Sequence, residues 1–313
     1  MRKIPCIFFH NVLERREASD VYHAKQLTAN ELAAALEFVK TRYEPISIDT
    51  FLDLALDRRR VTLSKPPIFI SFDDGHRGTF VRGAKVLAEL KVPALVFVLG
   101  RVMVDPAFVP PYIEFCHLVR GAGAKRATFR GREISLQSPG DYQWLRSQWL
   151  TVRADTCGPF LEELSRALGA TRPRLADLPD DLAYVTADEL RRHSGHEYLR
   201  VASHAMSHLP LAWLPSAAQA NELRQSHEIL SGILDDYRPV VSYPDGSHDA
   251  TARQSAAKIY QFGFAVKNGA DWRDPFAYPR DCIATGDIKE IRYHFSRRRK
   301  WLVLPAKKVL GIG

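Results

Sequence analysis

The sequence predicts an α/β fold, a deformed TIM-like barrel of parallel strands with an insertion on its rim. Two observations carry this prediction. Short apolar segments alternate with helical segments, and this order is typical of parallel strands joined by crossover helices. Two of the strand-like segments end directly in aspartates or histidines, as expected where a barrel presents reactive groups at one rim. A length of 313 residues is sufficient for one such barrel.

The first third of the chain begins this alternation. The predicted elements are strands at residues 4–9, 46–48, 68–70 and 94–98, and helices that begin near residue 28 and span residues 50–57 and 79–90. Thr28 and Glu31 form a capping box, which marks the start of the first helix. The segment 65–67, with its two prolines, leads into the strand that ends in two aspartates.

The alternation breaks between residues of about 105 and 181. A hairpin is predicted at residues 127–136, and helices are predicted within residues 141–168. We expect this segment to be an insertion on the barrel rim, where such barrels place substrate contacts, within a single domain that spans residues 1–313. The alternation then resumes with strands that end near residues 203, 243 and 266 and with helices at 216–234 and 250–262.

Composition favours a globular protein without nucleic acid as its partner. The net charge is +8, and basic clusters lie at residues 58–60 and 297–300, but no recognisable nucleic-acid module accompanies them. Such clusters are most often solvated surface, and here they favour an anionic substrate or peripheral contact with an anionic membrane through a basic C-terminal tail at about 284–313. The four cysteines are isolated, and no signal peptide is recognised, so a cytoplasmic location is expected, including the inner membrane face.

Two short motifs carry the chemistry. SFDDG at residues 71–75 follows an apolar strand, and neither of its carboxylates can be buried unpaired without a large desolvation cost. SHAMSH at residues 203–208 places His204 and His208 four residues apart. Two neutral histidine nitrogens and one carboxylate oxygen make a three-ligand site for a divalent metal, which leaves the second aspartate free to act as a base. The pattern indicates metal-assisted hydrolysis.

These motifs resemble those of the polysaccharide deacetylase family, the NodB-homology fold of carbohydrate esterase family 4. FFHNV at residues 8–12 resembles the opening strand of the circularly permuted branch, which includes the poly-N-acetylglucosamine deacetylases. SYPDGS at 242–247 and YPRDCI at 278–283 resemble two later segments of that branch. The resemblance covers residues of about 4–97 and 186–283, and it implies a barrel of seven strands.

The resemblance also implies a role for each site residue. These residues are the metal ligands Asp74, His204 and His208, the general base Asp73, the general acid His10, and Arg280 and Tyr243. Arg280 is expected to orient Asp73 and hold it ionised, and the Tyr243 amide is expected to stabilise the oxyanion. The implied cofactor is one divalent ion, expected to be zinc, with cobalt, nickel and manganese as alternatives.

Each candidate also has a structural interpretation. Asp73 and Asp74 could cap a helix, and the two histidines of SHAMSH could lie on an exposed turn. A lone histidine at a strand end, such as His10, is more often a packed residue, and Arg280 could pair with any carboxylate. The two motifs together favour catalysis for the aspartates and the paired histidines, whereas the roles of His10 and Arg280 depend on the resemblance.

Three positions depart from the family pattern. His76 stands where tyrosine or tryptophan is usual, and Asp245 replaces a tyrosine. Ser242 stands where the unpermuted branch has an arginine, so Arg280 is expected to supply that charge. We expect His76 to be a surface residue, with an extra metal ligand or a substrate contact as alternatives.

The sequence therefore predicts a metal-dependent N-deacetylase of an amino sugar. The expected substrate is phosphate-bearing, either a nucleotide sugar or a lipid-linked glycan used in surface-polysaccharide assembly. Two rival hypotheses are a related barrel that binds metal but has lost turnover, and a hydrolase of a non-sugar amide or a formamide.

Overall fold

The structure is a computed structural model, and it describes residues 1, 3–17, 22–23, 26–122, 126–136, 138–266, 270–284 and 287–294. The basic cluster at 297–300 and most of the predicted tail lie outside these residues. Among the described residues, no helix has both the length and the apolar character needed to cross a membrane. Cys6, Cys116, Cys157 and Cys282 form no disulfide with one another, and the first three are buried.

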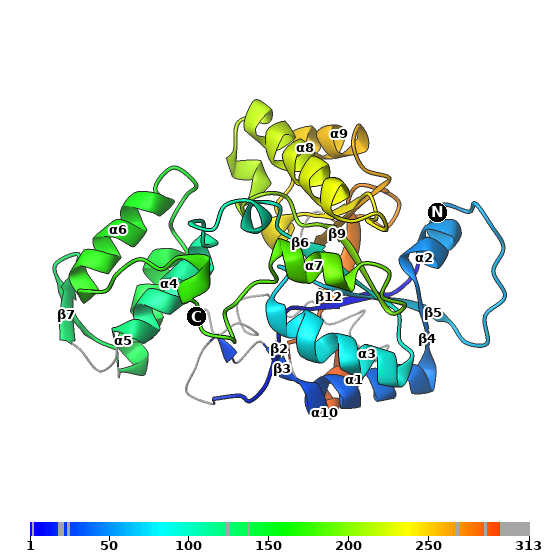
Figure 1. Ribbon diagram of the computed structural model, residues 1–313, viewed down its shortest axis with the longest axis horizontal. Coiled ribbons are helices and arrows are strands. Elements are labelled where there is room, and N and C mark those ends of the chain that lie inside the picture. Colours follow the sequence, from blue (N-terminus) through cyan, green and yellow to red (C-terminus); the bar gives the residue numbers. More distant parts are fainter. Residues whose placement is uncertain are drawn as a thin grey trace.

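Seven parallel strands form a closed ring at the centre of the molecule (Figure 1). In ring order they are β1 (Cys6–Phe9), β12 (Tyr278–Cys282), β11 (Phe262–Val266), β10 (Val240–Ser242), β9 (Leu199–Ser203), β6 (Ala94–Val98) and β5 (Pro67–Phe72), which pairs again with β1. An eighth strand, β4 (Glu44–Ile46), pairs with the first residues of β5. The predicted seven-stranded α/β barrel is confirmed.

Aromatic side chains close one end of this barrel. Helix α2 (Ile48–Ala55) inserts Phe51, whose ring centroid lies 4.8 Å from that of Phe69 on β5. Phe51 also contacts Phe262 and Tyr278, the first residues of β11 and β12. Because these residues begin their strands, Phe51 seals the amino-terminal end of the barrel. The carboxyl ends of the parallel strands therefore meet at the opposite rim, where polar groups can face a cavity.

Helices cover the outside of the ring. Those near predicted ranges are α1 (Ala29–Arg42), α3 (Ala84–Leu90), α8 (Ser216–Ile233) and α9 (Ala250–Ala257). Two more are α7 (Ala187–His193) and α10 (Ile288–His294), and α10 lies within the segment predicted as a basic tail. The capping boxes of Thr28 with Glu31 and of Thr186 with Glu189 are both present. Helix α3 is preceded by a π-helical turn (Thr79–Gly83). A short parallel pair, β2 (Val12–Leu13) and β3 (Leu27–Thr28), was not predicted.

The segment between β6 and β9 forms a lobe beside the barrel, drawn in green in Figure 1. It contains α4 (Pro111–Gly121), the antiparallel hairpin of β7 (Arg126–Phe129) and β8 (Arg132–Ser135), α5 (Pro139–Trp149) and α6 (Cys157–Leu168). Its buried side chains, among them Phe115, Phe129 and Phe160, form a hydrophobic cluster of their own. The hairpin prediction is confirmed. The strands before and after this segment, β6 and β9, are neighbours in the ring. The amide of Leu175 donates to the Pro106 carbonyl at 3.2 Å, so the two ends of the lobe lie side by side.

Candidate active site

The predicted site residues meet at the carboxyl rim of the barrel. His10 follows β1, Asp73 and Asp74 follow β5, and His204 follows β9. Arg280 lies within β12. Each strand ends in a loop that turns its polar residue toward the same opening, and this arrangement follows from the parallel order of the ring.

Asp74, His204 and His208 converge on one point. Oδ1 of Asp74 lies 3.3 Å from Nε2 of His204 and 3.2 Å from Nε2 of His208. The three ligand atoms lie within 4.8 Å of one another. Oδ1 of Asp74 is buried and has no hydrogen-bond partner in the described structure, a costly state for a carboxylate oxygen unless a cation or proton lies beside it. These three side chains therefore fit a divalent metal ion.

The charges of this cluster support the same conclusion. Burial raises the pKa of Asp74, but His208 and the other neighbouring histidines outweigh it and hold the pKa well below its usual value. Burial lowers the pKa of His208, but the Asp74 carboxylate raises it, to about 10 in the absence of metal. Without a metal, His208 therefore holds a proton, and its positive charge balances the Asp74 carboxylate. A metal ion that binds here must displace that proton.

The loop that carries the two histidines has a strained backbone, and hydrogen bonds from a neighbouring helix hold it in place. Ala205 and His208 have left-handed backbones with φ of 60° and 57°, which is rare outside glycine. Glu222 on α8 fixes this loop, because its carboxylate accepts hydrogen bonds from the amides of Met206 (3.1 Å) and Ser207 (3.0 Å). The Ser207 hydroxyl donates to the same carboxylate at 2.7 Å. No motif marked Glu222 in the sequence, since a glutamate within a helix has no distinctive signature.

A second hydrogen bond orients His204. Its Nδ1 lies 2.8 Å from the Ser242 carbonyl oxygen, which can only accept, so Nδ1 carries the proton. Nε2 is then the nitrogen left with a lone pair toward Asp74 and the metal point.

Asp73 is held apart from the metal cluster by Arg280. The guanidinium donates to both carboxylate oxygens, at 2.7 and 2.8 Å. Arg280 also donates to the hydroxyls of Ser71 and Ser242, and its guanidinium carbon lies 4.4 Å from the centre of the Phe8 ring. Burial raises the pKa of Asp73, but Arg280 together with His204 and His10 outweighs it, so the pKa is lowered and the carboxylate is ionised at neutral pH. The contact expected between Arg280 and Asp73 is thus present.

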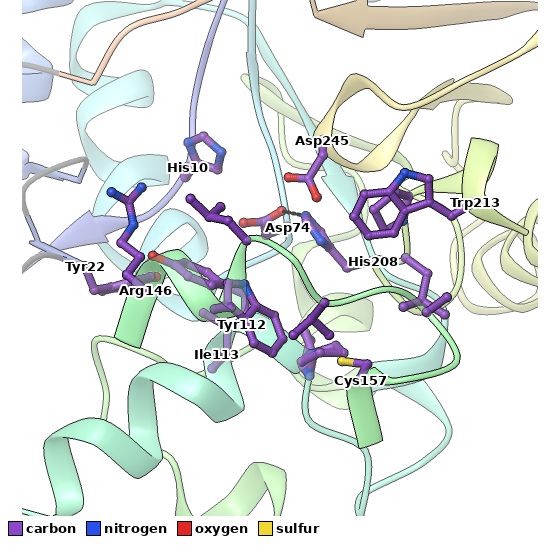
Figure 2. A pocket seen from close by; sticks show the side chains of 18 of the residues that line it. His10, Tyr22, Asp74, Tyr112, Ile113, Arg146, Cys157, His208, Trp213 and Asp245 are labelled. Atoms are coloured by element: carbon purple, nitrogen blue, oxygen red, sulfur yellow. Dashed lines mark ion pairs between the residues drawn. The ribbon is translucent and has the colours of Figure 1, made fainter. Parts of the chain in front are cut away.

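His10 lies at the wall of the same cavity (Figure 2). Its Nδ1 is buried and has no hydrogen-bond partner in the described part of the chain. Burial lowers the pKa of His10, while Asp74 and Asp73 partly offset this effect. His10 is not one of the clustered ligands. Its ring therefore lies beside the carboxylates with one nitrogen uncommitted, as a proton donor to substrate requires.

His76 is buried, and the predicted surface position is wrong. Its backbone bridges to Tyr184 at the end of the insertion, and the two rings lie 4.6 Å apart. Nε2 of His76 lies 3.1 Å from the Tyr22 hydroxyl and 3.5 Å from Oδ2 of Asp74, the oxygen that faces away from His204. Tyr184 is distant in sequence, and its backbone pairing with His76 buries the histidine against the end of the insertion. There the His76 ring contacts Asp74, a candidate metal ligand.

The oxyanion assignment for Tyr243 is also wrong. Its amide donates to the Phe264 carbonyl at 3.1 Å as part of the barrel ladder, and an amide has one proton to donate. Its hydroxyl donates to the Phe276 carbonyl at 2.9 Å. Asp245, two residues later, has a left-handed backbone with φ of 52° and lies near His208 at the cavity wall (Figure 2).

The cavity above these residues has a volume of about 390 Å³. One end is lined by Asp74, His208 and Asp245, and the wall continues to Tyr112, Trp149 and Arg146 of the insertion (Figure 2). A volume of this size accommodates a small sugar derivative, in the usual range of ligand pockets. The barrel therefore supplies the reactive groups, and the insertion supplies much of the surface that surrounds a ligand.

Comparisons with known proteins agree with this geometry. The family model described as polysaccharide deacetylase matches residues 160–261, which include His204 and His208. The comparison with curated proteins found no match.

Among solved structures, similar folds include the de-N-acetylase from Aggregatibacter actinomycetemcomitans, with a TM-score of 0.60, 14% identity and coverage of 94% of this chain and 99% of that one. The deacetylase PplD from Streptococcus pyogenes gives a TM-score of 0.58 at 14% identity over 90% and 93% of the two chains. IcaB from Ammonifex degensii gives 0.56 at 13% identity over 92% and 94%. The segment that carries the two histidines therefore matches the polysaccharide deacetylase family model, and the barrel is similar in fold to those of solved deacetylases.

Proposed function

We propose that this protein removes the N-acetyl group from an amino sugar, with one divalent metal ion, zinc in the native enzyme, held by Asp74, His204 and His208. The observation that carries the proposal is the separation of the two aspartates. Asp74 faces the two histidines, whereas Asp73 is locked against Arg280 on the other side of the motif. A ligand and a base are thus available side by side.

Each residue then has one task. When bound, the metal acts as a Lewis acid that polarises the acetyl carbonyl and lowers the pKa of a water molecule. Asp73 accepts the proton of the attacking water, and Arg280 keeps the carboxylate ionised and fixed in orientation. His10 donates a proton to the departing amine nitrogen through its uncommitted ring nitrogen. The Tyr243 amide is occupied by the Phe264 carbonyl, so a metal ion held by Asp74, His204 and His208 would be the positive group available to the oxyanion.

The substrate class we propose is a nucleotide sugar or a lipid-linked glycan, processed in the cytoplasm or at the inner membrane face. Two features support this proposal. The net charge of +8 favours a phosphate-bearing ligand. The four cysteines, three of them buried, form no disulfide with one another, which fits a reducing compartment.

The test is acetate release from UDP-N-acetylglucosamine, a polyprenyl-diphosphate N-acetylglucosamine and chitobiose, before and after chelation and after zinc is restored. We expect release that is lost on chelation and recovered with zinc. Release of formate from N-formyl analogues at a higher rate would favour the formamide hydrolase instead. Stoichiometric zinc binding without any product from the whole panel would indicate a barrel that has lost turnover.

A further inference from the structure

The two oxygens of the Asp74 carboxylate meet different partners. Oδ1 lies 3.3 Å from Nε2 of His204 and 3.2 Å from Nε2 of His208, whereas Oδ2 lies 3.5 Å from Nε2 of His76. The His76 side chain is fully buried, so water does not compete for this contact. One oxygen of the candidate ligand thus faces the metal point, and the other faces a residue that none of the assigned roles uses.

The tautomer of His76 follows from its surroundings. Nδ1 is buried and has no hydrogen-bond partner in the part of the chain that the structure describes, so a proton on this nitrogen would be a costly unpaired donor. Nε2 lies 3.1 Å from the Tyr22 hydroxyl and 3.5 Å from Oδ2 of Asp74, and both oxygens can accept a hydrogen bond. Nε2 therefore carries the proton and presents it to these two oxygens.

The end of the insertion holds the His76 ring in this position. The amides of Arg77 and Val185 donate across the two segments, to the carbonyls of Ala183 and Gly75, at 2.9 and 3.1 Å. These two hydrogen bonds flank the backbone bridge between His76 and Tyr184, whose ring packs against that of His76. The orientation of the imidazole is consequently set by a distant segment and does not depend on the loop of Asp74 alone.

We propose that His76 is a positioning residue that fixes Asp74 for metal binding. This inference rests on the proposed metal site. The Nε2 proton engages Oδ2, so Oδ1 is the oxygen that remains for the ion beside His204 and His208. Ligating carboxylates are commonly held in this way by an outer hydrogen bond, and losing such a partner typically lowers metal affinity by about 10–100-fold. Without His76, the carboxylate is free to turn and to offer both of its oxygens.

Two substitutions of His76 test this role through zinc affinity, measured with a competing chelator. His76→Leu fills much of the buried space but donates no hydrogen bond, and we expect it to lower the affinity by about 10–100-fold. His76→Gln can place an amide donor near the position of Nε2, so it should recover most of this loss. A glutamine variant as weak as the leucine variant would show that the donor is not what matters, and would overturn the proposal.

The visible absorption spectrum of the cobalt-loaded protein separates positioning from a merely structural role, because it reports the ligands around the ion. We expect the spectrum to change in His76→Leu, where the released carboxylate alters the ligand set, and to stay close to that of the wild type in His76→Gln. Urea unfolding of the metal-free variants gives their stability. A loss of stability in His76→Leu with the zinc affinity and the cobalt spectrum unchanged would reduce His76 to a packing residue.

His227→Leu is the matched control. Nδ1 of His227 lies 3.4 Å from the Tyr237 hydroxyl, and its ring centroid lies 5.6 Å from that of Tyr260. Like His76, it contacts two tyrosines, but it forms no ion pair with a carboxylate within the described residues. The control should leave both the zinc affinity and the cobalt spectrum unchanged. Equal effects of the two leucine variants would overturn the proposal.

The outcomes also separate this inference from the proposed function. A wild-type protein that binds neither zinc nor cobalt would refute the metal site, and the role of His76 with it. Stoichiometric metal with the same affinity and spectrum in the wild type and in His76→Leu would refute the role of His76 alone and leave the deacetylase proposal standing. Neither readout requires acetate release, so the identity of the sugar does not affect the result.

Discussion

Removing Arg280 should destabilise the barrel by leaving a buried carboxylate without its counter-charge. Arg280 is 1% exposed and Asp73 is 4% exposed, and two direct hydrogen bonds join them. Breaking a buried pair by removing one partner costs about 3–5 kcal/mol, because the remaining charge is uncompensated. We therefore expect Arg280→Gln to lower the free energy of unfolding by about this amount at pH 7.

The loss should depend on pH in a defined direction. In the wild type, Arg280 lowers the pKa of Asp73, so this group stabilises the fold above its unfolded pKa of about 3.9, and the contribution is lost as pH falls through the folded value. In the variant, burial is the largest influence on the pKa of Asp73 and is offset only by His204 and His10, so we expect this pKa to rise above the unfolded value. The carboxyl group of Asp73 in the folded variant is then neutral in mild acid. As pH rises, its ionisation increasingly lowers the free energy of unfolding. The difference between the two proteins should shrink as pH falls from 7 to 4.

Urea unfolding followed by tryptophan fluorescence at pH 7 and pH 4 measures this difference. Arg224→Gln is the control, because its ion pair with Glu228 is half-exposed and separated by one helical turn. Such a pair contributes about 0.3–0.5 kcal/mol. A variant of Arg280 no less stable than this control, or a loss that is the same at both pH values, would refute the reasoning. The double variant Asp73→Asn/Arg280→Gln should recover part of the loss.

Four further predictions concern the metal site and the acid. Asp73→Asn should abolish turnover with zinc content unchanged, whereas His204→Ala should lower both, as plasma emission spectrometry and acetate release can show. His10→Ala should reduce kcat by about 10²–10⁴-fold with zinc content unchanged, the range for general acid–base catalysis; an unaffected rate would leave the acid unidentified. Zinc affinity, measured with a competing chelator, should rise about tenfold per pH unit between pH 6 and 8, because the metal displaces the proton of His208, whose pKa is raised to about 10. Glu222→Ala should weaken zinc binding about 10–100-fold by releasing the strained histidine loop, as loss of a supporting contact commonly does.

The candidate metal ligands could be predicted from the sequence because their position depends on where each strand ends. Asp73 and Asp74 follow one buried strand, and His204 follows another, so parallel pairing alone brings them to one rim. The pairing of Arg280 with Asp73 was predicted from the family resemblance and not from spacing, since many carboxylates could have met a strand arginine.

The errors arose where distant segments decide the environment. His76 is buried because its backbone pairs with Tyr184 at the far end of the insertion, and no local signal announces that bridge. The Tyr243 amide is occupied because β10 and β11 run in a register that presents the Phe264 carbonyl to it. Such contacts depend on how strands align, and a single sequence does not specify that alignment.

The contact between the two ends of the lobe has a consequence for how this protein could acquire new substrates. Leu175 donates to the Pro106 carbonyl, so the segment between them starts and finishes at nearly the same place beside the barrel. The entropy of closing such a loop grows only with the logarithm of its length, about 0.6 kcal/mol for each doubling. Exchange of the whole lobe for a shorter or longer one therefore costs the barrel little. Evolution or engineering can replace the whole lobe, including Arg146 and the rest of its cavity wall. The strands that carry Asp74 and His204 then keep their register.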